Sequence, residues 1–162
     1  MDQVLLITGG GRGIGAATAV LAAQRGYAVA VNYASNSLAA DEVVRTIRAG
    51  GGTAMAVQAD VGDEAQVLAM FQKVDARFGR LTALVNNAGV VDVQARVDEM
   101  SVARLERMFR INVIGSFICA REAVRRMSTR YGGAGGAIVN ISSAASRLGS
   151  PDQYVDYAAS KG

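Results

Sequence analysis

Histidine is absent from the 162 residues, and cysteine and proline each occur only once. Without histidine the chain cannot form a serine–histidine triad or a histidine-ligated metal site, and we expect no metal. Any catalytic acid or base must therefore be a Tyr, Lys, Asp, Glu or Cys side chain. Cys119 cannot form an internal disulfide, and its place in the apolar run Phe117–Ala120 predicts a buried structural thiol.

Long hydrophobic runs are also lacking. The longest, such as Val4–Ile7 and Tyr27–Val31, are far shorter than the roughly 18 residues that a membrane span needs. No basic and then apolar leader opens the sequence, so we expect a cytoplasmic protein with no membrane partner.

The chain has no strong charge of one sign either. The formal net charge is +3, but the basic residues are scattered among acidic ones. The densest patch, Arg121–Arg130, has its arginines at helical spacing, which is typical of a solvated helix face. We therefore expect no nucleic-acid partner.

The chain does contain a regular alternation of short apolar, β-branched runs with longer helical segments. This pattern indicates an α/β fold of βαβ units around a parallel sheet. The expected strands are Val4–Thr8, Tyr27–Asn32, Thr53–Gln58, Leu81–Asn86 and Ala137–Ser142. The expected helices are Gly13–Arg25, Ser37–Ala49, Asp63–Phe78 and Ser101–Thr129. With no linker and no internal repeat, residues 1–162 are expected to form a single domain.

A glycine-rich turn, Thr8–Gly15, follows the first expected strand and opens the first expected helix. Glycine permits a tight turn and a close approach of the backbone to a pyrophosphate, and free N–H groups at a helix start favour an anion. The spacing of Gly9, Gly13 and Gly15 differs from the common dinucleotide fingerprint, and such a turn can also be purely structural. Its place between a strand and a helix favours a nucleotide site.

The second expected strand ends without a carboxylate, because the next acidic residue is Asp41. In dinucleotide-binding domains an acid near this point usually accepts the ribose hydroxyls. Without it a 2′-phosphate would not be repelled, and Arg12 could pair with that phosphate. This favours NADP. NAD stays possible, because no arginine follows Tyr33 and Arg12 could be a solvated loop charge.

Several further motifs follow in order along the chain. They are Asp60-Val61, Asn86-Asn-Ala-Gly89, Asn112, Ser142-Ser143 and Tyr157-x-x-x-Lys161. With the glycine turn, they make the whole chain closely resemble the short-chain dehydrogenase/reductase family. The resemblance implies a Rossmann-type doubly wound parallel sheet of order 3-2-1-4-5 and an NAD(P)-dependent oxidoreductase.

The resemblance implies a role for each catalytic position. Tyr157 would be the acid in carbonyl reduction and the base in alcohol oxidation, and Lys161 would also hold the nicotinamide ribose. Ser143 would bind the substrate oxygen, and Asn112 would disturb its helix and hold a water that relays protons. The chemistry is consistent, because an unperturbed tyrosine pKa is about 10 and a cation one helical turn away lowers such a value.

Two neighbouring residues compete for these roles. Tyr154 has Ala158, not a lysine, four residues later, so it is expected to be a loop aromatic near the substrate. Ser142 precedes Ser143, but the family's catalytic serine is usually the second of such a pair.

The resemblance also assigns the cofactor contacts. Asp60 would accept from the adenine amino group beside Val61, and the Asn-Asn-Ala-Gly turn would form a wall next to the ribose and pyrophosphate. The implied cofactor-binding residues are Gly9, Arg12, Gly13, Ile14, Gly15, Tyr33, Asp60, Val61, Asn87, Ala88, Gly89, Tyr157 and Lys161.

The family continues beyond the position of Lys161 with further strands and the loop that covers the substrate. We therefore expect a fragment of a longer enzyme, with a Rossmann domain incomplete at its C-terminus; a naturally short protein is the alternative. The expected function is an NADP(H)-preferring oxidoreductase that interconverts a carbonyl and a secondary alcohol, similar to 3-oxoacyl-carrier-protein reductases or sugar dehydrogenases. The alternative is a nucleotide-binding module without turnover. The expected partners are a small carbonyl or alcohol and further copies of the chain, as a tetramer or dimer.

Overall fold

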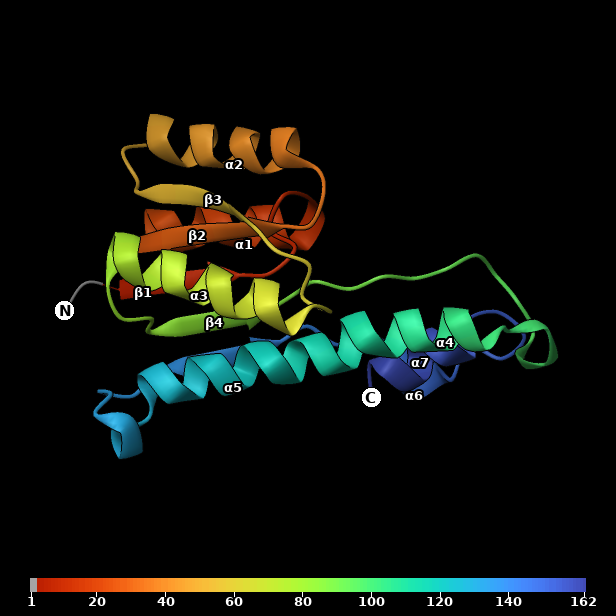
Figure 1. The fold of residues 1–162 in the computed structure, drawn as a ribbon. Helices are drawn as coiled ribbons and strands as arrows, with labels where there is room; N and C mark the ends of the chain where they lie inside the picture. The colour runs from red at the N-terminus through yellow and green to blue at the C-terminus, as the bar shows by residue number, and fades with distance from the viewer. Residues whose placement is uncertain (1–2) are drawn as a thin grey trace.

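A five-stranded parallel sheet forms the centre of the computed structural model, which describes residues 3–162 (Figure 1). The strand order is β3-β2-β1-β4-β5, which confirms the order expected from the sequence. The strands are β1 (Gln3–Ile7), β2 (Tyr27–Tyr33), β3 (Ala54–Gln58), β4 (Ala83–Asn86) and β5 (Ala137–Asn140). The α-helices are α1 (Gly13–Gln24), α2 (Ser37–Ala49), α3 (Glu64–Phe78), α4 (Val102–Phe109), α5 (Gly115–Met127), α6 (Ala145–Leu148) and α7 (Val155–Ser160).

The sheet has a hydrophobic core on each face because successive side chains of a strand point to opposite sides. Along β1, Leu5 and Ile7 belong to a cluster shared with α1 and α2, whereas Val4 and Leu6 belong to a cluster shared with α3 and α5. The chain changes face where the strand order reverses, between β1 and β4. Ligands of doubly wound sheets bind at the carboxyl ends of the strands at this point.

The sequence predicted one continuous helix at Ser101–Thr129, and this prediction is wrong. The structure divides it into α4, a π-helical segment η2 (Arg110–Ile114) and α5. Asn112 lies in this π segment, and its side-chain amide donates to the Val90 carbonyl in the loop after β4. Ser116 Oγ donates to the Asn112 backbone carbonyl at 2.9 Å. Single π turns inside α-helices are frequent at functional sites. Figure 1 shows α5 running along the sheet and α4 preceding it beyond the ends of the strands, with α6 and α7 beside α4.

Smaller differences lie at the ends of elements. β4 begins at Ala83 and β5 ends at Asn140, inside the expected limits, and α6 and the 3₁₀ turns η1 (Val97–Glu99) and η3 (Thr129–Tyr131) were not expected. Thr82 is outside β4 because its hydroxyl group bonds to both backbone groups of Val4.

The solvated arginine face expected on α5 is also partly wrong. Arg126 is only 18% exposed; it pairs with Asp75 of α3 at 2.8 Å and lies over the Phe71 ring at 4.8 Å. Arg121 of α5 pairs with Glu64, which also belongs to α3, at 2.6 Å. These arginines therefore hold α5 against α3. Cys119 of α5 is buried in the core that α5 shares with α3, as expected, and burial raises the pKa of its thiol to about 12.

Within residues 3–162, the structure contains no helix that is long and apolar enough to cross a membrane.

Candidate active site

The glycine turn between β1 and α1 has the shape that a bound anion requires. Gly9 and Gly13 have φ values of +61° and +54°, a region that other residues rarely adopt. A Cβ at Gly15 would lie 2.5 Å from the Gly9 carbonyl oxygen, so no larger side chain fits there. No side chain caps the N-terminus of α1, and its first N–H groups are therefore free to receive an anion. Ile14 is exposed beside them.

The glycine turn is fixed to the Asn-Asn-Ala-Gly turn after β4. Thr8 Oγ1 accepts from the backbone N–H groups of Asn87 and Ala88, each at 3.0 Å. The Asn87 amide donates to the carbonyl groups of Thr8 and Gly9, each at 2.9 Å. A Cβ at Gly9 would lie 3.0 Å from Ala88 Cα. The two turns therefore form one continuous wall, in which Asn87 holds the glycine turn in place.

The end of β2 carries Asn32 and Tyr33 and no carboxylate. The Asn32 side chain is buried; it accepts from Gly9 N at 3.1 Å and donates to the carbonyl groups of Ala59 and Val57 at 3.0 and 3.3 Å. Asn32 therefore connects three segments that surround the nucleotide end of the site. Arg12 is exposed and forms no ion pair with any residue in the described range 3–162.

At the end of β3, Asp60 and Val61 have different surroundings. Asp60 is exposed, and one of its carboxylate oxygens accepts from Gly62 N at 2.9 Å. The Val61 side chain is buried in the core beneath α3, where it touches Gly115. Only the backbone of Val61 can therefore face a ligand, while Asp60 presents its carboxylate.

Asn112 is held in the π segment by an almost complete set of hydrogen bonds. It accepts from Val90 N at 2.8 Å and donates to Val90 O and to Ser160 Oγ, each at 2.9 Å. Asn112 thus joins the segment after β4 to α7. The expected disturbance of the helix at this residue is present in the structure; the expected bound water stays a prediction.

Lys161 lies at the C-terminal end of α7 and reaches back to the sheet. Its Nζ donates to the carbonyl oxygen of Ile141 at 3.0 Å. A Cβ at Gly89 would lie 3.2 Å from this Nζ and 3.4 Å from Asn112 Oδ1, so glycine leaves the room for both groups. Burial lowers the pKa of Lys161 below its ordinary value. No ion pair to this ammonium group exists within residues 3–162.

Tyr157 lies in α7, and Lys161 follows it by four residues as the C-cap residue of that helix. Tyr157 is half-buried, and Tyr154 is the residue that precedes the helix. The spacing argument that selected Tyr157 therefore agrees with the helix that the structure contains.

The structure also separates the two serines after β5. Ser142 Oγ donates to the Lys161 carbonyl at 2.6 Å and so fixes the end of α7. Ser142 and Ser143 both line an open pocket of about 380 Å³, together with Ala144, Ser146 and Arg147. The Ser143 hydroxyl oxygen accepts only a weak local bond from Ala145 N at 3.2 Å. This arrangement favours Ser143 as the serine that meets a substrate.

The sequence analysis missed three residues that shape this site: Arg104, Asp156 and Ser160. Asp156 and Ser160 are buried polar residues, each directly before Tyr157 or Lys161. A polar pair at this spacing, beside a catalytic pair, is the signal that could have revealed them.

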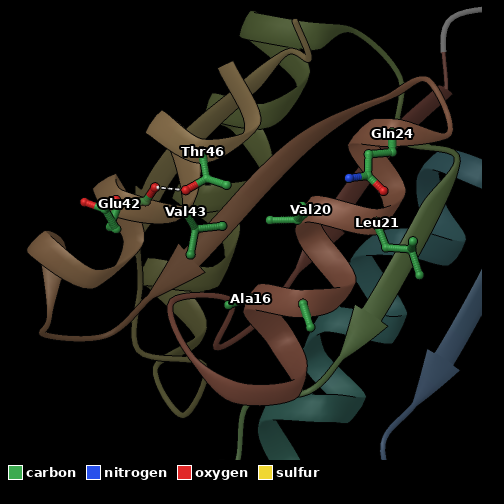
Figure 2. Close-up of a pocket in the computed structure, with 8 residues that line it drawn as sticks. Ala16, Val20, Leu21, Gln24, Glu42, Val43 and Thr46 are labelled. Carbon is green, nitrogen blue, oxygen red and sulfur yellow. Dashed lines mark hydrogen bonds between the residues drawn. The ribbon is translucent and has the colours of Figure 1, made fainter. Parts of the chain in front are cut away.

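A larger groove of about 560 Å³ lies elsewhere, between α1 and α2 (Figure 2). Val20 of α1 points toward Val43 of α2 across it, and Leu21 and Thr46 also line it; it contains none of the predicted site residues.

The model of the family described as short chain dehydrogenase matches residues 3–162. The oxidoreductase YgfF of Escherichia coli, described as uncharacterized, is 57% identical over 159 residues, which cover 98% of this chain and 64% of that protein. A probable tetrahydroxynaphthalene reductase of Zymoseptoria tritici is 40% identical over 99% of this chain and 58% of its own length.

A solved structure shows the same fold. The short-chain dehydrogenase/reductase of Serratia marcescens matches with a TM-score of 0.88 and 34% identity, covering 98% of this chain and 62% of that one. The chain thus spans about three fifths of the length of the relatives that it matches.

Proposed function

The chain belongs to the short-chain dehydrogenase family, and on that premise we propose that it carries the nucleotide site and the acid–base residues of an NAD(P)-dependent oxidoreductase that interconverts a carbonyl and a secondary alcohol. The observation that carries the proposal is that Tyr157 lies in α7 and Lys161 is the C-cap residue of the same helix, with the Lys161 ammonium beside Asn112 and the turn after β4. We also propose that residues 1–162 act as one nucleotide-binding domain. The cytoplasmic location expected from the sequence stays a prediction.

The shape of the glycine turn fits a dinucleotide. The uncapped start of α1 can receive a pyrophosphate, and Gly9 and Gly15 leave room for the backbone to approach it. Ile14, Ala88 and Gly89 would line the adenosine and ribose, with Asp60 at the adenine. When bound, a nicotinamide cofactor supplies or accepts the hydride.

The chain's own residues would manage the proton. The Tyr157 hydroxyl would donate it to the carbonyl oxygen during reduction, and Ser143 Oγ would donate a hydrogen bond to the same oxygen. The Lys161 ammonium would favour the phenolate that forms when the proton leaves. Its nearest acceptor in the structure is the Ile141 carbonyl, so its other N–H groups can meet the ribose hydroxyls. Asn112 would hold the segment after β4 against α7.

NADP is the proposed preference over NAD. The end of β2 offers the half-buried Tyr33 but no carboxylate, and the Asn32 side chain there is engaged in structural hydrogen bonds. The exposed Arg12 lies in the glycine turn, at the N-cap of α1. Arg12→Glu in the full-length protein should weaken NADPH binding about tenfold or more and leave NADH binding little changed. Equal loss for both cofactors would contradict the proposed role of Arg12.

The substrate class is proposed to be that of 3-oxoacyl-carrier-protein reductases or sugar dehydrogenases. The pocket beside Ser143 is open and carries Ser146 and Arg147, which suits a polar substrate. The relative named as a tetrahydroxynaphthalene reductase adds aromatic ketones to the compounds worth testing.

The test is NADPH consumption by the full-length protein against a panel of 3-oxoacyl thioesters, sugars and aromatic ketones. Turnover that is lost in Tyr157→Phe supports the proposal. Tight NADPH binding without turnover of any compound would favour the alternative, a nucleotide-binding module.

A further inference from the structure

An ion pair connects α4 to α7 at the edge of the candidate active site. Arg104 of α4 donates from Nε to one oxygen of Asp156 at 2.7 Å and from Nη2 to the other at 3.2 Å. The two side chains are only 9% and 0% exposed. The third guanidinium nitrogen of Arg104, Nη1, donates to the Val93 carbonyl at 2.7 Å. The guanidinium is therefore fixed in its orientation by three bonds.

Asp156 is connected to the catalytic tyrosine as well as to Arg104. Its Oδ1 accepts from the backbone N–H of Tyr157 at 2.9 Å. Four residues later, Ser160 is joined to Asn112 and accepts its bond at 2.9 Å. Asp156 and Ser160 thus form a buried stripe that faces α4 and the π segment, and each directly precedes one residue of the Tyr157 and Lys161 pair.

Other hydrogen bonds hold the C-terminal end of α7, where Ser142 Oγ donates to the Lys161 carbonyl and Asn112 donates to Ser160 Oγ, whereas the ion pair acts nearer its N-terminal end. The helix contains only six residues, and no side chain caps its N-terminus. A helix of this length is marginal by itself in water, so contacts with other elements must decide where it lies.

Stability alone does not explain a buried ion pair. Removing two charges from water costs about as much free energy as their attraction returns, and apolar residues of similar size often serve equally well. The bidentate geometry does fix a direction and a distance between two helices, which apolar contacts do not.

We propose that Arg104 and Asp156 are positioning residues that set the register of α7 against α4 and so place the Tyr157 hydroxyl for proton transfer. This inference rests on the proposed function. Neither residue touches the reacting atoms; both act through Tyr157.

The decisive variant is the double substitution Arg104→Met with Asp156→Leu in the full-length protein. It removes both charges together, so no buried ion is left unpaired and the fold is expected to be retained. We expect a thermal midpoint at or above that of the unchanged protein, with kcat about 10- to 100-fold lower, because small misplacements of a catalytic group have effects of this size. KM and the NADPH dissociation constant should change little.

A matched control is available in the exposed pair Arg96 and Asp98, whose side chains are 61% and 64% exposed. Arg96→Met with Asp98→Leu makes the same chemical change outside the site and should leave kcat unchanged. A milder test is Arg104→Lys, which keeps the charge and loses the bidentate geometry; kcat should fall while KM stays the same.

A folded Arg104→Met/Asp156→Leu variant with the kcat of the control would overturn the inference. If the unchanged protein shows no turnover, the proposed function fails separately, and amide hydrogen exchange still decides the positioning role. Faster exchange at residues 155–160 in the double variant, with exchange in α1 unchanged, supports it; unchanged exchange in α7 overturns it.

Discussion

At the scale of single residues, the site contains groups whose positions cost stability. Lys161 is the strongest example, because its ammonium is half-buried with one hydrogen bond to the Ile141 carbonyl and no counter-ion within residues 3–162. Burial lowers the pKa of Lys161, which means that the folded state disfavours the charged form. The folded state therefore bears a free-energy cost for keeping the ammonium form. Such costs are common where residues serve function.

Lys161→Met should therefore raise the free energy of unfolding of the cofactor-free protein, by about 0.5–1 kcal/mol, while turnover is lost. Urea unfolding at pH 7 measures the first effect and NADPH consumption the second. Lys73→Met, a change at an exposed lysine of α3, should alter neither. A less stable Lys161→Met variant would show that the ammonium stabilises the fold.

At the scale of elements, the π segment between α4 and α5 explains how Asn112 reaches both Val90 and Ser160. The segment also brings Gly115 against the loop after β3. A Cβ at Gly115 would lie 2.9 Å from both Val61 Cγ2 and the Val61 carbonyl oxygen. The helix can approach Val61 this closely only because residue 115 has no side chain.

Gly115→Ala is expected to lower the free energy of unfolding by roughly 1–3 kcal/mol, because the added methyl group overpacks the contact with Val61. Gly50→Ala is the matched control, since its nearest neighbour would be 3.5 Å away, an ordinary contact. Chemical denaturation of both variants provides the measurement, and equal stabilities would contradict the packing argument.

The contact between α4 and α7 has a predictable pH dependence. Burial by itself would raise the pKa of Asp156, but the hydrogen bonds from Arg104 and the Tyr157 backbone outweigh it, and the pKa lies below its ordinary value. A carboxyl group whose pKa is lower in the folded state contributes stability at pH values above its pKa in the unfolded chain, which is about 3.9 for aspartate. This contribution is lost as the pH falls through the pKa of the group in the folded protein.

The unchanged chain should therefore lose stability more steeply between pH 5 and the acid limit, roughly pH 2, than the Arg104→Met/Asp156→Leu variant does. Urea unfolding at a series of pH values tests this. Parallel pH profiles for the two proteins would mean that the pair does not contribute to acid unfolding.

At the scale of the whole molecule, local patterns predicted most of the fold. Buried β-branched runs predicted the strands, whereas the strand order was expected from the resemblance to short-chain dehydrogenases, and the order β3-β2-β1-β4-β5 in the structure confirms it. The glycine turn and the spacing of Tyr157 and Lys161 were equally local. The Arg104–Asp156 pair was not predictable, because it joins residues 52 positions apart whose contact depends on the finished fold. The π turn depends on contacts of the same kind.

Self-association is a property of the whole molecule that the surface makes testable. Ile114, at the end of η2, and Phe117 and Val124 of α5 are 47%, 74% and 45% exposed and lie three and seven residues apart along one side of this helical stretch. We expect this stripe to be covered by a second copy of the chain. Phe117→Asp should lower the mass measured by sedimentation, while Leu38→Asp, at an exposed leucine of α2, should not. An unchanged mass for Phe117→Asp would exclude this stripe as the interface.

The central claim is that the protein transfers hydride while Tyr157 transfers the proton. The most direct test supplies NADPH with deuterium in place of both hydrogens at C4 of the nicotinamide to the full-length protein with a ketone that it turns over, and analyses the product by mass spectrometry. The account predicts an alcohol with deuterium on the former carbonyl carbon, formed by the unchanged protein and not by Tyr157→Phe. An alcohol without deuterium, or an equal yield from Tyr157→Phe, would contradict it.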